Sequence, residues 1–405
     1  MTVHEFIKEN WINTVNYAYG RENHPLKDLD RKFTVPCIDT LFIDFFYWDT
    51  YFTNIGLIID GLEDQAQQNL DVMKYLCDKY GYIPNADHIL TRSQPPFFTR
   101  AIYDYYIATN DKELLKKYLP SAITELKFWD KHRKTSIGLN AYGNCETKEG
   151  IDWYYKEFDH RLQYSKTEKE LDKTKFCCDL LAIAESGWDF NLRFLTDKNR
   201  FATYSFAHLD LNCILYDAEV KLSSMLKTIG ENEQSDEFAK KAKQRKDLIN
   251  KYLFDKEKGI YLDYNFVDNS FSRVVSAASF YPYAFGISDD AEGAKKVFEK
   301  LNLKFGISAG EYLGDQIKYF QWDYPNMWPT NVYVAYNAMK NVRLYENAEI
   351  IKNEYISTVD NVFNKTGKLW EKYNAATGDV SITEEYETPP MMGWTAGVYN
   401  YLINE

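Results

Sequence analysis

Apolar residues recur at steps of three and four through most of this 405-residue chain, and this period constrains its fold more than any other feature. The clearest run is Leu211, Ile214, Leu215, Ala218, Leu222 and Met225. Such spacing puts side chains on one face of an α-helix and predicts a helix that faces a core. The same period predicts helices within residues 4–19, 49–60, 63–79, 96–109, 112–131, 238–253, 289–301, 332–342, 345–363 and 393–403. The chain is therefore expected to be all-α, with about a dozen helices.

Two stretches depart from this period. Residues 259–267 alternate and run into Asp268-Asn269-Ser270, which predicts a small β-hairpin between helices. Residues 137–175 have weak periodicity, but their aromatic cluster at residues 153–155 argues against disorder. We expect this second stretch to form a lid or rim over a site.

The arrangement of the helices follows from what the chain lacks. No proline-, glycine- or serine-rich linker separates two cores, so residues 1–405 are expected to form a single domain. An α-solenoid would show a fixed-period repeat, and none is found. The better prediction is an (α/α)6 barrel, in which two concentric rings of helices enclose one core.

Charge and composition limit the partners. A net charge of −12 argues against nucleic acid and against an anionic membrane surface, since both attract clustered Lys and Arg. No run of about 18 apolar residues occurs, and the acidic start of the chain is unlike an export signal. Aromatic residues make up 17% of the chain, which leaves surface on which a neutral sugar could stack.

The cysteines indicate the compartment. All six are scattered, without a C-x-x-C pair, as expected of reduced thiols in a cytoplasmic protein. No group of His, Cys, Asp and Glu shows metal-ligand spacing, so neither a metal nor another cofactor is predicted. We expect a cytoplasmic monomer or weak homo-oligomer that acts on a small molecule.

Two carboxylates and an indole lie beside a glycine in residues 184–191. A carboxyl against the ring of Trp188 loses solvation, which favours its neutral form and suits Asp189 to donate a proton. The alternative is an ordinary helix end, with Gly187 as the C-cap and Asp189 capping the next segment. The motif alone leaves both interpretations open.

Other polar and aromatic clusters occur where helices are expected to begin or end. They are residues 46–51, 81–85, 91–96, 321–328, 370–374 and 393–395. Each cluster alone is more often a packed indole beside a helix cap than a platform for a sugar. Their order along the chain is more specific.

In that order the clusters resemble the trehalases of glycoside hydrolase family 37, from about residue 36 to residue 403. The matching segments are residues 48–51, Asn85, 92–96, 185–190, 209–212, 321–328 and 371–373. The resemblance implies an (α/α)6 barrel and an exo-acting, inverting hydrolase of an α-glucosidic bond.

The same resemblance implies roles for individual residues. The general acid falls on Asp189 and the general base on Glu371, which agrees with the two carboxyl groups that an inverting glycosidase needs. Lys372 would help to keep Glu371 ionised. The implied sugar-binding residues are Trp48, Asp49, Asn85, Arg92, Gln94, Glu185, Gly187, Trp188, Gln321, Trp322, Trp328 and Trp394.

The chain departs from the family pattern where the leaving group would bind. Leu41 replaces a sugar-binding arginine, and residues 150–156 lack a second one, so only Arg92 remains of three. A glycine-rich run is missing before Tyr386, and residues 389–391 replace a polar segment. Each lost charged contact is worth about 1.5–3 kcal/mol, so we expect trehalose to be a poorer substrate than another α-glucoside. Related family 63 hydrolases of glucosylglycerate, mannosylglycerate and α-glucosyl oligosaccharides share the core, which keeps those substrates as alternatives.

Two other classes of function remain open. A sugar epimerase on an α/α barrel works with histidines, and of the six here only His88 lies near a cluster, beside Arg92. A non-catalytic carbohydrate-binding protein would not need both Asp189 and Glu371. The presence of both carboxylates favours the hydrolase.

Overall fold

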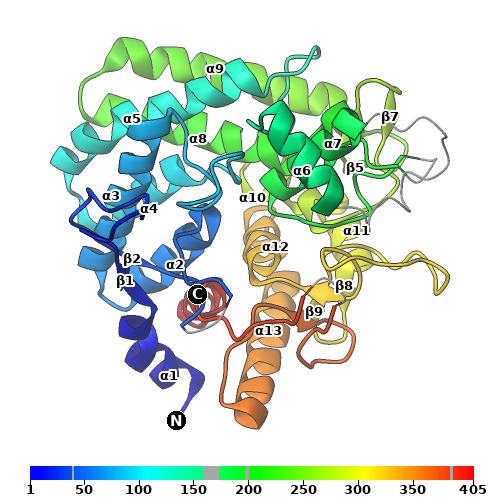
Figure 1. The fold of residues 1–405 in the computed structure, drawn as a ribbon. Coiled ribbons are helices and arrows are strands. Elements are labelled where there is room, and N and C mark those ends of the chain that lie inside the picture. The colour runs from blue at the N-terminus through cyan, green and yellow to red at the C-terminus, as the bar shows by residue number, and fades with distance from the viewer. Residues whose placement is uncertain (39–40, 158–172, 197–199, 384–385) are drawn as a thin grey trace.

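The computed structural model describes residues 1–38, 41–157, 173–196, 200–383 and 386–405 (Figure 1). Contacts between its inner helices run from α2 through α4, α8, α10 and α12 to α14. Helix α14 packs against α2 again, so the inner helices form a closed ring. This is the (α/α)6 barrel that the sequence predicts.

The two rings differ in how much of each helix is buried. The inner helices are α2 (Tyr47–Ile59), α4 (Phe98–Thr109), α8 (Leu209–Thr228), α10 (Tyr281–Ala284), α12 (Pro329–Asn341) and α14 (Gly393–Asn404). The outer helices are α1 (Val3–Asn10), α3 (Glu63–Tyr80), α5 (Lys112–His132), α9 (Asn232–Tyr252), α11 (Ala291–Leu301) and α13 (Tyr345–Thr366). Most residues of α2, α12 and α14 are buried because neighbours cover them on every side, whereas α9 buries one face. In the described ranges, no helix has both the length and the apolar run required to cross a bilayer.

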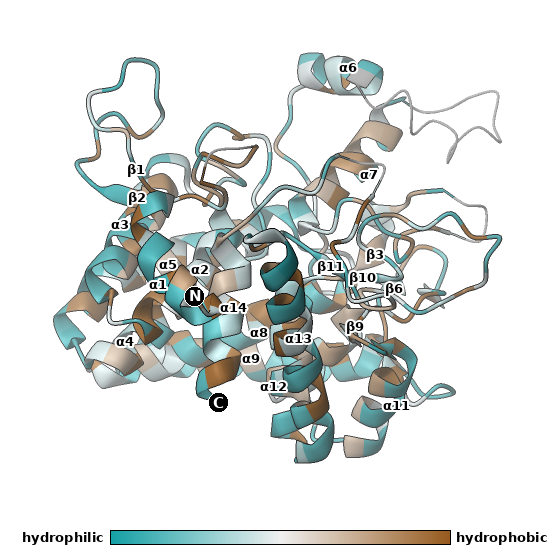
Figure 2. Ribbon diagram, turned by 90° about the horizontal axis from the view of Figure 1, so that it is seen from below, coloured by the Kyte–Doolittle hydropathy of each residue, from teal (hydrophilic) through white to brown (hydrophobic). Residues whose placement is uncertain are grey.

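Two further helices leave the barrel between α5 and α8. Helix α6 (Lys148–Glu157) packs on α7 (Lys173–Ser186), and both stand out at one end of the barrel (Figure 2). A small apolar cluster of its own lies beneath them and includes Ile151, Phe176, Leu180 and Phe320. The stretch expected to be a lid, residues 137–175, thus contains α6 and the start of α7, while its residues 158–172 lie outside the described part. Its role as a lid stays a prediction.

Short strands join the helices. They are β1 (Val15–Tyr17), β2 (Lys32–Thr34), β3 (Phe206–Ala207), β4 (Phe254–Asp255), β5 (Ile260–Tyr261), β6 (Tyr264–Asn265), β7 (Ser270–Phe271), β8 (Asn302–Leu303), β9 (Gly306–Ile307), β10 (Asn326–Met327) and β11 (Tyr373–Asn374). The predicted hairpin is present as β6 and β7, although its first half is divided, because β5 pairs with β4 instead. The helix predicted within residues 4–19 ends at Asn10, since the chain continues as a 3-10 turn and then pairs as β1 with β2.

The ring closes through two glycines. A Cβ atom on Gly397 of α14 would lie 1.9 Å from the carbonyl oxygen of Phe52 in α2, and one on Gly56 would lie 2.8 Å from the Cα of Gly397. No real Cβ contact is that short, so the absence of side chains lets the two backbones touch. The first and last inner helices therefore pack closer together than larger residues would allow.

Candidate active site

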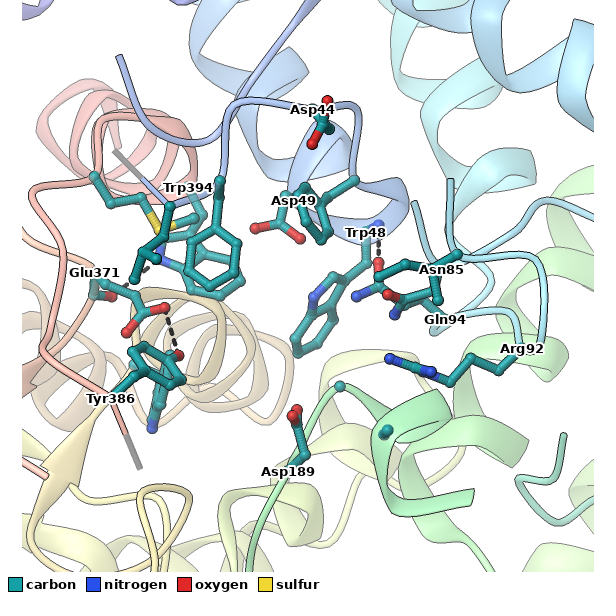
Figure 3. Close-up of a pocket in the computed structure, with 18 of the residues that line it drawn as sticks. Asp44, Trp48, Asp49, Asn85, Arg92, Gln94, Asp189, Glu371, Tyr386 and Trp394 are labelled. Carbon is teal, nitrogen blue, oxygen red and sulfur yellow. Dashed lines mark hydrogen bonds between the residues drawn. The ribbon is translucent and has the colours of Figure 1, made fainter. Parts of the chain in front are cut away.

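A cavity of about 440 Å³ opens at the end of the barrel where the inner helices α2, α4, α12 and α14 begin. Most of the predicted site residues line it, as Figure 3 shows for many of them. They are Trp48, Asp49, Asn85, Arg92, Gln94, Gly187, Asp189, Trp322, Trp328, Glu371 and Trp394. Residues that lie up to 346 positions apart, from Trp48 to Trp394, thus meet around one space.

Three predicted substrate-binding residues lie behind this lining. Glu185 is fully buried and accepts two hydrogen bonds from Arg133, from Nη2 at 2.7 Å and from Nε at 2.8 Å. Its Oε1 also accepts from the backbone N–H of Ser93 at 3.0 Å, so Glu185 holds the segment that carries Arg92. The ring of Trp188 lies 4.6 Å from the guanidinium of Arg193 and does not line the cavity.

The third, Gln321, fastens the segment that carries Asp189. Its side-chain N–H donates to the carbonyl oxygen of Asp189. The next residue, Trp322, donates its backbone N–H to the carbonyl of Phe190 at 3.0 Å, and Asp323 accepts from the N–H of Leu192 at 2.9 Å. Three consecutive residues therefore fix the loop on which Asp189 projects into the cavity.

Glu371 is held by groups on both sides of its carboxylate. Lys372, itself fully buried, donates from Nζ to Oε2 at 2.6 Å. The Tyr386 hydroxyl donates to Oε1 at 2.7 Å (Figure 3). The carbonyl oxygen of Glu371 accepts from the indole N–H of Trp394 at 2.9 Å. These contacts fix both the side chain and the backbone of Glu371 at the wall opposite Arg92.

Indole rings form the base of the cavity. Trp322 stacks on Trp328 with ring centroids 3.7 Å apart and planes 3° apart. Trp48 packs at 5.7 Å from Trp322 and at 5.9 Å from Trp394. Trp188 supports Trp322 from behind at 5.1 Å. These rings restrain one another, which gives a sugar a rigid aromatic surface.

Gly187 lets the end of α7 approach this surface. Its φ is +73°, a left-handed conformation that favours glycine. A Cβ atom there would lie 2.8 Å from Cζ2 of Trp48. Any side chain at this position would displace the indole from the cavity wall.

Several lining residues were not predicted as site residues. They are Leu41, Phe42, Asp44, Phe46, His88, Ile89, Ala184, Tyr386 and Met391. Phe46 lies within one of the aromatic clusters, and Tyr386 follows the segment in which the family pattern is broken. A signal was therefore present for these two and for Leu41, which stands where the family pattern has a sugar-binding arginine, whereas nothing in the sequence separates Ile89 from ordinary surface residues.

A third carboxyl group, that of Asp49, shares the cavity with Asp189 and Glu371. Burial raises its pKa to about 8, and the two neighbouring carboxylates act in the same direction. Asp49 is therefore largely protonated near neutral pH and can both donate to and accept from a sugar hydroxyl.

Asp49→Asn is expected to stabilise the protein at neutral pH. An unfolded chain releases this proton near pH 3.8, whereas the folded protein holds it up to about pH 8, so rising pH across that window weakens folding. The substitution removes this penalty and should raise the free energy of unfolding at pH 7.5 by on the order of 2–4 kcal/mol, with little change at pH 4. Urea unfolding at both pH values measures it. An equal gain at both would show that ionisation of Asp49 is not the cause.

One group near the mouth of the cavity has the composition of a metal site. Ligand atoms of His24, Asp44 and Asp87 lie within 4.8 Å of one another. However, Nδ1 of His24 accepts the N–H of Leu26 at 3.1 Å, so its proton resides on the Nε2 that faces Asp87. A protonated nitrogen cannot bind a metal, and metal-bound histidine normally donates from its other nitrogen. The group instead links the loop around His24 to the mouth of the cavity.

Comparisons with known proteins identify a family and a fold. The family model described as Trehalase matches residues 2–405. A trehalase of Tenebrio molitor is 29% identical over 420 residues, which cover 95% of this chain and 73% of that protein. The neutral trehalase of Saccharomyces cerevisiae has a TM-score of 0.75 at 21% identity, with 99% of this chain and 79% of that chain covered. A family 63 mannosylglycerate hydrolase from Thermus thermophilus, solved with glucose, has a TM-score of 0.66 at 14% identity and 99% coverage of both chains. The two structural likenesses show a shared fold.

Proposed function

Because the chain belongs to the trehalase family and is a glycoside hydrolase acting on an O-glycosyl bond, we propose that it cleaves an α-glucosidic bond with inversion. Asp189 is the general acid and Glu371 is the general base. The observation that carries the proposal is that both carboxyl groups point into one cavity from separate segments (Figure 3).

The surroundings of the two groups support different roles. Glu371 is fixed by Lys372 and Tyr386, both of which donate to its oxygens, so it is oriented to accept a proton from water. Asp189 is only partly buried, lines the same cavity, and has its backbone fixed by Gln321. This suits it to reach the oxygen that links the two halves of a substrate.

The reaction then follows from these positions. Asp189 donates its proton to the glycosidic oxygen as the bond from that oxygen to C1 breaks. Glu371 removes a proton from a water molecule that attacks C1 from the opposite face. The products are β-glucose and the free alcohol of the leaving group, and the two carboxyl groups end with their protonation states exchanged.

The floor of the cavity fits the glucose ring. The rings of Trp48, Trp322 and Trp394 offer a stacking surface, and Asp49, Asn85 and Gln94 offer polar groups beside it. Gln94 accepts the backbone N–H of Trp48 at 3.1 Å, so it also fixes the first turn of α2. An exo-acting hydrolase needs such a closed end for one sugar and an open mouth for the leaving group.

Release of β-glucose is the direct test of this mechanism. Fresh product from an α-glucoside should show the β-anomer first in proton NMR spectra, before mutarotation mixes the anomers. The protein is incubated with methyl α-glucoside, whose leaving group is methanol and contributes no second anomeric carbon, and spectra are recorded during the first minutes. Initial appearance of α-glucose would mean retention and would contradict the assigned pairing of acid and base.

A further inference from the structure

The cavity changes character from its floor to its mouth. Trp48, Asp49 and Glu371 at the floor are no more than 6% exposed, whereas Leu41 at the mouth is 60% exposed. Phe42, Phe46 and Ile89 are partly exposed and line the same space. The mouth of the cavity therefore presents apolar side chains that the residues of the floor do not cover.

Contacts between rings join part of this lining into one aromatic wall. Tyr386 meets Phe42 edge to face at 5.9 Å, Phe42 meets Phe46 at 5.3 Å, and Phe46 meets His88 at 6.3 Å. All three pairs are within 10° of perpendicular. The wall thus extends continuously from Tyr386, whose hydroxyl donates to Glu371, as far as His88. Each ring in it restrains its neighbour.

The polar groups at the mouth are mostly engaged with one another. Nδ1 of His88 lies 3.0 Å from Asp87 and 3.7 Å from Asp44. The hydroxyl of Tyr386 is committed to Glu371. Among the described lining residues, Arg92 is the only one with a guanidinium or ammonium group. Among the described residues of the mouth, a second sugar ring would meet Arg92, whose Nε has no partner, and the part-exposed Asp44 and His88, and each further hydroxyl that loses water without a new partner weakens binding.

We propose that the mouth of this cavity selects an α-glucoside whose leaving group presents an apolar surface, such as an alkyl or aryl group. Leu41, Phe42, Phe46 and Ile89 are the residues that contact it. This proposal rests on the function proposed above, since it places glucose at the floor and the leaving group at the mouth. It makes Leu41 and Ile89 determinants of specificity, because they line the mouth beside this wall.

The test compares glucosides that differ only in apolar length. Methyl, butyl and hexyl α-glucosides release alcohols of similar acidity, so the chemical step stays nearly constant while the buried apolar area grows. Burial of methylene groups should raise kcat/KM at least about tenfold from methyl to hexyl, and the hexyl compound should exceed trehalose. A flat series, or trehalose above all three glucosides, would overturn the proposal.

Variants test whether residues at the mouth cause the dependence of kcat/KM on alkyl length. Leu41→Asn and Ile89→Asn should flatten the series, so that kcat/KM on hexyl α-glucoside falls toward the value on methyl α-glucoside. Ile43→Asn is the matched control, since Ile43 lies in the same loop, is 47% exposed and does not line the cavity. If Ile43→Asn flattens the series as strongly as Leu41→Asn, the wall is not the determinant.

A binding measurement separates this proposal from the proposed function. Calorimetric titration of the Asp189→Asn variant gives Kd values for methyl and hexyl α-glucosides without turnover. Tighter binding of the hexyl compound by about tenfold supports the apolar mouth even if the parent protein hydrolyses neither. Equal binding of both overturns the proposal, whereas absence of product with the parent protein refutes the proposed function alone.

Discussion

Asp189→Asn and Glu371→Gln are each expected to lower kcat by at least about a hundredfold, because each removes a proton transfer that water performs poorly. Both residues point into the cavity, and neither lies in one of the helices whose contacts close the barrel. The fold should therefore survive, with circular dichroism close to that of the parent, although Glu371→Gln should melt at a lower temperature because it leaves the buried Lys372 without its counter-charge. Steady-state rates on the best α-glucoside measure the loss.

The two variants should differ in a way that assigns the roles. The loss in Asp189→Asn should shrink with p-nitrophenyl α-glucoside, because nitrophenolate leaves without a proton donor. The loss in Glu371→Ala should be partly restored by azide, which attacks C1 without a base and yields β-glucosyl azide. Glu387→Gln is the control, since this exposed carboxylate follows Tyr386 but does not line the cavity. Near-parent activity in either cavity variant would contradict the assignment.

Arg133→Met is expected to lower the free energy of unfolding by about 3–5 kcal/mol, because it leaves a buried carboxylate without its partner. Glu185 is fully buried, and Arg133 donates to both of its oxygens. Two backbone N–H groups, those of Ser93 and Gly143, would remain on that carboxylate but cannot neutralise its charge. Urea unfolding followed by tryptophan fluorescence measures the change.

The adjacent residue supplies the comparison for this experiment. Lys134 pairs with Asp130 at 3.4 Å, but 48% and 29% of their side chains are exposed. Lys134→Met should therefore cost less than about 1 kcal/mol. If the two methionine variants cost the same, the buried pair does not stabilise the segment around Arg92 as described. The double variant Arg133→Met, Glu185→Gln should recover part of the loss, since no unpaired charge remains.

The barrel could be predicted because its signal is repeated along the whole chain. Each helix buries a stripe of side chains, so the period in residues 211–225 or 345–363 is visible without knowledge of the partner helix. The short strands were harder to predict from the sequence. Strands such as those that pair Tyr264 with Phe271 are too short to show an alternating pattern. The start of the chain was predicted as one long helix because Trp11 continues the period, although its indole N–H reaches Asp60 from a 3-10 turn.

The site was less predictable than the fold, for a physical reason. Motif matching finds residues near the chemistry, but it does not tell which side of a loop each side chain faces. Glu185 and Gly187 are two positions apart, yet one is clamped by Arg133 behind the lining and the other touches Trp48. Arg133 itself carries no motif, and the apolar wall at Leu41 and Ile89 is created by loops that meet only in three dimensions.

The contact between Gly56 and Gly397 has a consequence for the order in which the protein becomes active during synthesis. A ribosome makes α2 early and α14 late, and the indole of Trp394 and the last wall of the cavity arrive with α14. A nascent chain that has emerged only through α13 is expected to have an open arc of inner helices, without the backbone of Gly397 that packs against the carbonyl of Phe52 in the closed ring. Hydrolysis of sugars by such a chain is not expected, because the cavity lacks the wall that α14 supplies until that helix seats against α2.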